Sequence, residues 1–433
     1  MLPSIIANPP QVTTAIFTEM SLFCNWLGVK YVQVAGIITE YNPLHSGHVH
    51  LMREVRRLLG PETAVVCVMS GNFVQRGDFA LVRRQARAKA AVESGADLVL
   101  ELPLPWAVSS AERFADGGVQ ALMATGLVTH LAFGSECGDG AALTRLAAAL
   151  LSEELTEHLR RELSRGVSFP TARQRAAAVL VSPEDAALLA SPNNTLGVEY
   201  CKSLLRHGSA IRPLTVTRQG AAHDGEAREE EHPSASAIRA LLRTGEREQA
   251  LSLMVPAMGA AYEEEEGAGR APVFLETCER AVLARLRTMT EADFARLDEG
   301  REGLCNRLYD ASRTAPSVAE VLETAKTKRY AYARLRRMVL WAYLGLTPED
   351  CPASPLYLRP LAANGTGRTL LARMRKTASV PILTKPADVR RLGPEAQALF
   401  ALEAKAADLY TLAYPDLSAA AGGSAWKEGP VIV

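Results

Sequence analysis

The chain has no excess of charge of either sign and few cysteines. Lys and Arg together number 48, as do Asp and Glu, so the net charge gives no indication of a nucleic-acid partner. The seven cysteines are scattered, and no two have the spacing of a metal-binding pair. An odd, scattered set is typical of a reducing compartment, so we expect a cytoplasmic location and predict no protein metal site.

Long apolar runs are also missing. A membrane span needs about 20 mostly apolar residues, and no stretch qualifies, so no membrane partner is expected. The start of the chain has no Lys or Arg before Lys30 and therefore lacks the basic region of a signal peptide. We predict that residues 1–30 are a dispensable extension, either a flexible arm or the product of a misassigned start with Met20 as another candidate.

The stretch from Tyr31 to Leu59 has the clearest structural pattern. Tyr31 to Thr39 is apolar and rich in β-branched residues, which predicts a strand buried on both faces. Asn42-Pro43 ends this strand, and from His48 the apolar residues recur at helical spacing. The pattern predicts a strand, a tight turn and a helix, with His45-Ser46-Gly47-His48 where the helix begins.

This helix start suits a phosphate group. Free backbone N–H groups and the helix dipole favour an anion there, and Gly47 allows it to approach the backbone. His45 and His48 are three residues apart, so both can donate to phosphate oxygens that gain charge during a reaction. The same pair could belong to a zinc site or be solvated, but no HExxH or CxxC pattern accompanies it. We therefore favour phosphate binding and assign both histidines a catalytic role.

Strands and helices alternate along the first half of the chain. Further buried strands are predicted at Thr63 to Met69, Asp97 to Leu102, Thr129 to Phe133 and Ile211 to Thr217. The alternation predicts an α/β fold with a doubly wound parallel sheet. Ligands of such sheets bind outside the carboxyl ends of the strands, which is where the HSGH turn falls.

His-x-Gly-His after a first strand resembles the nucleotidyltransferase superfamily. The longer string GIITEYNPLHSGH, together with VMSGNFVQRGDFA and DLVLELP, is similar to the bacterial tRNA(Met) cytidine acetate ligase family. The likeness continues through FGSECGD, SPNNTLGVEY, KRYAYARLRRM, SVPILTKPAD and DLYTLAYP, so it covers about Val34 to Val433. Cofactor adenylyltransferases of the superfamily usually have Gly-x-Phe-Asp-Pro at the turn, whereas this chain has Glu40-Tyr41-Asn42-Pro43.

The resemblance implies a set of ATP contacts, with Mg²⁺ accompanying the nucleotide. The contacts are Ile38, Thr39, Glu40, Tyr41, Asn42, His45, Gly47, His48, Gly134, one of Asn193 and Asn194, Arg218, Gln219, Ser236 and Arg239. On the residues alone, an Asn of this string is equally a helix N-cap. Likewise, the segment from Ser234 to Arg239 is equally a Ser N-cap followed by a solvated cation.

Composition changes after the predicted catalytic region, residues 31–256. Residues 257–272 contain the run EEEEGAG, which predicts a linker. Residues 273–433 are predicted to be mostly helical, with a small β-α-β unit formed by Leu356 to Leu361, a basic helix at 367–376 and Val380 to Thr384.

A basic helix is predicted at 328–344. Lys326 to Arg337 contains no acidic residue, and tyrosines lie between its cations, which suits an RNA backbone and unstacked bases. Its apolar Leu335 and Val339 would face a core while Arg and Tyr face outward. A merely solvated basic helix is the alternative. We predict tRNA contacts at Lys328, Arg329, Arg334, Arg336 and Arg337.

The resemblance implies an ATP-dependent acetate–tRNA ligase. Acetate would attack the α-phosphorus of ATP to give acetyl-adenylate and pyrophosphate, and the N4 amine of the wobble cytidine of elongator tRNA(Met) would then take the acetyl group. Acetate is already an anion at pH 7, so the first step needs positioning and charge stabilisation rather than a strong base.

Two alternatives remain, a small-molecule adenylyltransferase that makes a cofactor and a catalytically inactive tRNA-binding protein. The long basic C-terminal half argues against the first, and the intact HSGH turn argues against the second. The sequence does not indicate an oligomeric state.

Overall fold

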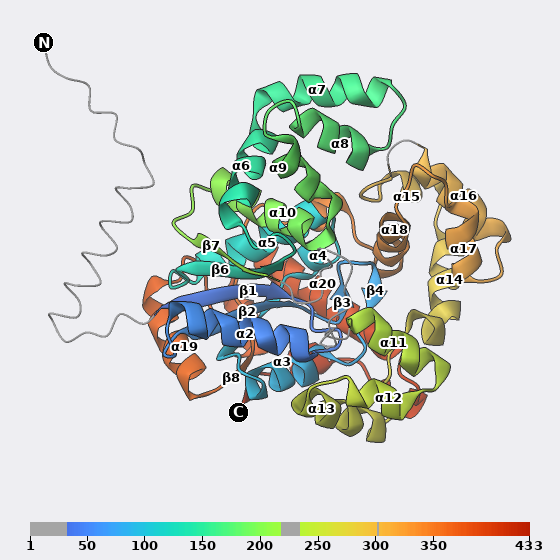
Figure 1. Cartoon of the computed structure of the whole chain (residues 1–433). Coiled ribbons are helices and arrows are strands. Elements are labelled where there is room, and N and C mark those ends of the chain that lie inside the picture. Colours follow the sequence, from blue (N-terminus) through green and yellow to red (C-terminus); the bar gives the residue numbers. More distant parts are fainter. Residues whose placement is uncertain (1–32, 218–233, 301–302) are drawn as a thin grey trace, which may run out of the picture.

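The computed structural model describes residues 33–217, 234–300 and 303–433 (Figure 1). The predicted extension 1–30 and the predicted ATP contacts Arg218 and Gln219 therefore lie outside the described residues. No helix in the described part of the chain is long and apolar enough to cross a membrane.

A seven-stranded sheet with the order β7-β6-β1-β2-β5-β8-β9 forms the centre of the molecule. Five strands are parallel: β1 (Val34–Thr39), β2 (Ala64–Ser70), β5 (Leu98–Leu102), β6 (His130–Ser135) and β7 (Arg212–Thr217). The strand order reverses between β1 and β6, which creates the crevice where ligands of such sheets bind. The predicted doubly wound α/β fold is confirmed.

Both faces of the sheet are covered, as the unbroken apolar strands predict. On one face Val34 and Ile38 of β1 belong to a core with α5 (Ala111–Ala124), α10 (Pro192–Arg206) and α19 (Gly365–Thr377). On the other face Ala35 and Ile37 pack with α2 (Ser46–Leu59) and α3 (Arg84–Glu93). Gly36 lets α5 lie close to β1, since a Cβ at this position would be 2.6 Å from Leu122 Cδ1.

The first half of the chain contains further elements outside this sheet. They are the hairpin strands β3 (Phe73–Val74) and β4 (Asp78–Phe79) and the helices α4 (Leu104–Ala107), α6 (Gly140–Leu151), α7 (Glu153–Ser164), α8 (Phe169–Ala177), α9 (Pro183–Ala187), α11 (Ala235–Thr244) and α12 (Arg247–Ser252).

A helix lies where the sequence predicts a linker. Helix α13 (Pro256–Gly267) buries Met258 and Tyr262 in the core that contains α3. Its acidic run is partly neutralised, because Arg83 and Arg270 both bond to the buried carboxylate of Glu265 at 2.8 Å. Both arginines lie outside the acidic run, so the composition of the run alone does not show that the segment forms a helix.

The C-terminal helices form a further core, which also includes Phe73 and Phe79 of the hairpin. It contains residues of α14 (Glu279–Thr288), α15 (Glu291–Ala295), α16 (Leu304–Thr314), α17 (Val318–Ala325), α18 (Tyr332–Leu344) and α20 (Pro394–Thr411). The same region also returns to the sheet, since β8 (Pro360–Ala363) pairs antiparallel with β5 and β9 (Val431–Ile432) pairs with β8. In the predicted β-α-β unit, α19 is present, but its two β segments are joined only by an isolated parallel bridge between Leu358 and Ile382 among the described residues.

Candidate functional site

The two histidines of the HSGH turn hold the start of α2. His45 is the N-cap, and its Nδ1 accepts a hydrogen bond from Gly47 N at 3.2 Å. His48 Nδ1 accepts one from His45 N, also at 3.2 Å, and the ring centroids are 3.8 Å apart. Because both Nδ1 atoms accept, each neutral ring carries its proton on Nε2. The backbone therefore sets both imidazoles as donors beside a helix start that has no acidic residue in its first turn.

The turn before the histidines is buried and held from several sides. Tyr41 has a φ of 47°, which is unusual for a residue with a side chain and a feature found at functional sites. Its hydroxyl lies 3.3 Å from Cys67 Sγ of β2, and its ring meets that of His48 edge-on. Burial raises the pKa of Tyr41 and raises that of Cys67 to about 12, so both are neutral at pH 7 and act as packing groups.

Arg87 is a site residue that the sequence did not reveal. It is completely buried in α3, and its guanidinium donates to the carbonyls of Glu40, Ser70 and Gly71, which follow or end β1 and β2. Burial lowers its pKa to about 10, so it stays charged at pH 7. One cation thus holds the carboxyl ends of two neighbouring strands together. The sequence shows a basic helix here but does not indicate which of its cations turns inward.

Glu40 anchors the β3–β4 hairpin to the end of β1. Its Oε1 accepts a hydrogen bond from Gln75 N at 2.7 Å. Burial raises the pKa of Glu40, against the opposing effects of the Gln75 N–H and of the charges of Arg76 and Arg87. Glu40 therefore serves as a support for the hairpin at the edge of the site.

The structure distinguishes Asn193 from Asn194. Asn194 is buried, and its Oδ1 accepts from Ser135 Oγ at 2.7 Å and from Glu136 N at 3.0 Å. It therefore shapes the loop that follows β6, the strand that contains Gly134. Asn193 is half-buried and donates from Nδ2 to Glu136 Oε1 at 2.7 Å. Neither is the N-cap of α10, which is Ser191. The Glu136 carboxylate instead accepts from the backbone N–H groups of both asparagines.

Helix α11 brings Arg239 to the same edge of the sheet. Ser234 is its N-cap and accepts from Ala237 N, as the sequence allows, whereas Ser236 is exposed. Arg239 is buried and donates to Asn42 Oδ1 at 3.1 Å and to Asp78 Oδ2 at 2.9 Å. The solvated arginine that we considered as an alternative is therefore excluded. The site now joins β1, α2, α11 and the hairpin.

The basic segment around α18 differs from the prediction. Lys328 and Arg329 are exposed, as predicted, but they lie in a turn before the helix. Arg337 is buried and bonds to both Glu299 carboxylate oxygens at 2.7 Å. Arg334 donates to the Glu299 carbonyl.

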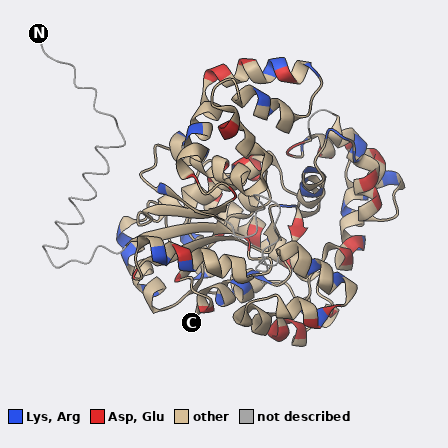
Figure 2. Cartoon of the chain, viewed as in Figure 1, with Lys and Arg blue, Asp and Glu red and all other residues tan. Residues whose placement is uncertain are grey.

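The prediction that the Arg and Tyr side chains of this segment face outward is wrong for Arg337 and Tyr330, since both are buried. The buried Trp341 of α18 likewise donates to Val108 O at 2.7 Å. Arg336 is half-buried and approaches Asp78 of the hairpin. Figure 2 shows the arginine positions of α18 in blue near strand β4, which contains Asp78.

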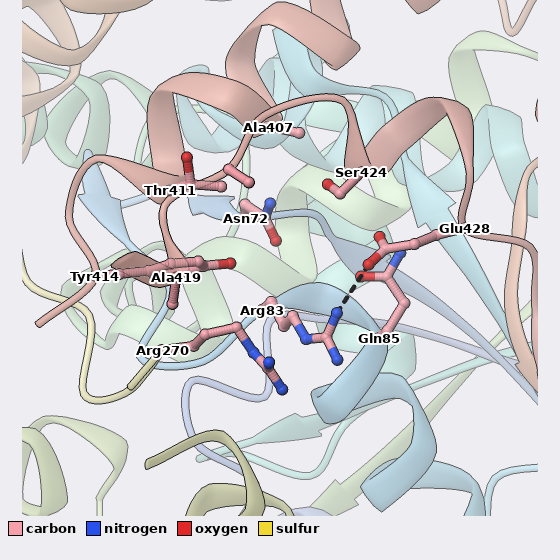
Figure 3. A pocket seen from close by; sticks show the side chains of 11 residues that line it. Asn72, Arg83, Gln85, Arg270, Ala407, Thr411, Tyr414, Ala419, Ser424 and Glu428 are labelled. Carbon is pink, nitrogen blue, oxygen red and sulfur yellow. Dashed lines mark hydrogen bonds and ion pairs between the residues drawn. The ribbon is translucent and has the colours of Figure 1, made fainter. Parts of the chain in front are cut away.

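A cavity of about 160 Å³ lies apart from the histidine pair. Its walls come from Asn72, Arg270, the start of α3, and the chain at and after the end of α20 (Figure 3). Arg83 in this cavity is paired with Glu428 at 2.8 Å. None of the predicted ATP contacts lines it, so the cavity is separate from the candidate phosphate site.

The chain is similar to known proteins over most of its length. The model of the family described as HIGH Nucleotidyl Transferase matches residues 32–424. A tRNA(Met) cytidine acetate ligase of Acetivibrio thermocellus is 36% identical over 93% of this chain and 100% of the relative. One of Fervidobacterium nodosum is 35% identical over 89% of this chain and 96% of the relative. The crystal structure of Thermotoga maritima TmcAL bound with alpha-thio ATP matches with a TM-score of 0.87 and 33% identity, covering 93% of this chain and 99% of that one.

Proposed function

Because the chain belongs to the tRNA(Met) cytidine acetate ligase family of HIGH nucleotidyl transferases, we propose that it uses ATP to activate acetate and transfers the acetyl group to tRNA(Met). The observation that carries this assignment is the histidine pair. The backbone holds both rings with Nε2–H as donor at the start of α2, which follows β1, the strand that borders the crevice of the sheet. This is the chemistry required to stabilise charge at a phosphorus under attack.

In the first step the acetate carboxylate attacks the α-phosphorus of ATP, and pyrophosphate leaves. We assign charge stabilisation at that phosphorus to His45, His48 and the α2 amino end near Gly47. Acetate needs no base at pH 7, so orientation is the main task of the site. The buried turn and the Arg87 bonds support it by fixing the ends of β1 and β2.

The nucleoside end of ATP would cross from β1 toward β6. In this arrangement Ile38 to Asn42 lie along one side, and Gly134 with Asn193 on the other. Asn193 is the better candidate for a direct contact, since Asn194 is buried and occupied by the loop after β6. Arg239 and the exposed Ser236 would lie toward the far end of the triphosphate.

Mg²⁺ would enter with the nucleotide. In the part of the chain that the structure describes, no group of three His, Cys, Asp or Glu side chains could hold a metal ion. Mg²⁺ commonly keeps several waters and binds through substrate phosphates, so an ion carried by ATP does not need three protein side chains as ligands. When bound, it would neutralise phosphate charge.

In the second step the N4 amine of the wobble cytidine attacks the acetyl carbonyl, and AMP leaves. An anticodon loop presents an unpaired base, which suits this attack. Lys328 and Arg329 are exposed and have no ion pair with any described residue, so we propose them as tRNA contacts. Helix α19 adds a second basic surface, formed by Arg368, Arg373, Arg375 and Lys376.

The test is incubation with bulk tRNA, ATP and labelled acetate, followed by nucleoside analysis. We expect label in N4-acetylcytidine only when all three components are present. ATP–pyrophosphate exchange that depends on acetate but not on tRNA would identify the first step separately. Nucleotide transfer to a small molecule without tRNA would instead support a cofactor adenylyltransferase, and absence of exchange would indicate an inactive RNA-binding protein.

A further inference from the structure

We propose that Arg243 and Arg336 bind the pyrophosphate end of ATP, together with Arg239. This proposal rests on the proposed function, because it assigns one part of the ATP site. It also gives Arg336 a role in the first step of the reaction, whereas its place in a basic segment predicts a contact with tRNA.

Three guanidinium groups converge on one carboxylate of the β3–β4 hairpin. Asp78 Oδ2 lies 2.9 Å from Arg239 Nη2, 3.6 Å from Arg243 Nη2 and 3.8 Å from Arg336 Nη1. The only other acidic partner among the described residues is Glu276, 3.4 Å from Arg243 Nε. Its side chain is 61% exposed, so water screens its charge. The cluster therefore keeps an excess of positive charge that an anion can use.

The cluster continues directly from the histidine pair. Arg239 donates to Asn42, three residues before His45, and to Asp78. Asp78 is also the shared partner of Arg243 and Arg336. An ATP with its α-phosphate at the start of α2 would extend its outer phosphates along this path. Arg239 is 7% exposed, whereas Arg243 and Arg336 are 33% and 36% exposed, so the two outer guanidiniums are open to a ligand.

The three guanidiniums are held in place before any ligand arrives. Arg243 lies over the Phe274 ring at 4.4 Å and Arg239 at 5.3 Å, while Arg336 lies over Tyr332 at 5.2 Å. Stacked guanidiniums lose less freedom when they bind phosphate in a bidentate way.

The hairpin and α18 also touch through their backbones. Gly77 has a φ of +74°, and a Cβ there would lie 2.5 Å from the backbone of Arg336 and Arg337. Only glycine permits this contact, which brings a C-terminal helix to the edge of the ATP site.

The alternative is that Asp78 simply fastens the hairpin to α11 and α18. One well-placed cation satisfies a carboxylate of this kind, and the buried Arg239 already supplies it at 2.9 Å. Arg243 and Arg336 are more distant and more exposed, which is the arrangement expected when a second anion completes the cluster.

The experiment compares ATP with AMP, since only ATP carries the outer phosphates. Arg243→Gln and Arg336→Gln are titrated with each nucleotide by calorimetry, and with inorganic pyrophosphate as competitor. Losing a hydrogen bond to a charged group should weaken ATP and pyrophosphate binding roughly tenfold or more while leaving AMP affinity unchanged. Arg280→Gln is the matched control, because Arg280 is exposed on α14 outside the cluster.

ATP affinity equal to wild type in both variants would overturn the proposal, as would a parallel loss of ATP and AMP affinity with a lower melting temperature. Weaker tRNA binding with unchanged ATP binding would show an RNA surface instead, and would also overturn it. A wild-type protein that binds no ATP would overturn both this proposal and the proposed function, which keeps the two failures distinguishable.

Discussion

Replacing Arg337 by Met should destabilise the protein without weakening its interaction with tRNA. Arg337 makes two bonds of 2.7 Å to the Glu299 carboxylate, with side-chain exposures of 10% and 17%. This bidentate pair joins α18 to the segment that follows α15. The guanidinium is therefore already occupied by protein and is a poor candidate for a phosphate contact.

The magnitude follows from the burial of the pair. Removing one partner of a buried ion pair costs about 3–5 kcal/mol, because the other charge stays buried without compensation. Glu299 is not fully buried, and Arg334 Nε remains 4.0 Å from its carboxylate. We therefore expect a loss of about 2–3 kcal/mol. Glu299→Gln should cost a similar amount, and the double variant should cost clearly less than the sum.

The assay is thermal melting of the single and double variants, with tRNA affinity measured at several salt concentrations on the same preparations. Arg337→Met should lower the melting temperature by several degrees and leave the salt dependence of tRNA binding unchanged. Arg329→Gln should do the reverse and flatten the log–log salt slope by about one unit at most. An Arg337→Met protein with wild-type melting and a flatter slope would refute the reasoning.

Two further predictions concern the histidine pair and a buried carboxyl group. His45→Asn should keep the N-cap of α2 but lose the imidazole, so we expect a melting temperature close to that of the wild type. Acetate-dependent pyrophosphate exchange should be at least about a hundredfold slower in this variant, and similarly slow in His48→Ala. Exchange at the wild-type rate would exclude a catalytic role for the histidines. Burial, reinforced by the charge of Glu101, raises the pKa of Glu403 to about 7 from 4.5, so the folded protein holds a proton that the unfolded chain releases between these values. Stability should therefore fall by up to about 3 kcal/mol as the pH rises through this window, and Glu403→Gln should flatten that part of the melting-temperature profile; parallel profiles for the two proteins would contradict the assignment.

The strand, turn and helix of the candidate site could be predicted because their pattern is local. The β-branched run to Thr39 and the apolar spacing after His48 lie within one short stretch, and the structure follows them closely. The N-cap role of Ser234 was likewise visible in the sequence as a possible alternative.

Roles that depend on distant partners could not be predicted in this way. Arg87 is buried because the ends of two strands offer it carbonyl groups. Arg337 is buried because Glu299 meets it from another segment. The acidic stretch at α13 is ordered because Arg83, far away in the sequence, bonds to Glu265. In each case the group that decides the environment of the residue lies elsewhere in the chain.

Strand β8 reaches the central sheet only after the chain has passed through the C-terminal helices. It covers the side of β5, where Glu101 N donates to Arg359 O at 2.8 Å and Leu98 pairs with Ala363. A fragment ending near Pro256 would leave this buried apolar strand as an open edge, which is prone to pair with other chains. The two chemical steps can therefore be separated by point substitutions, but not by cutting the chain into two independently folding halves.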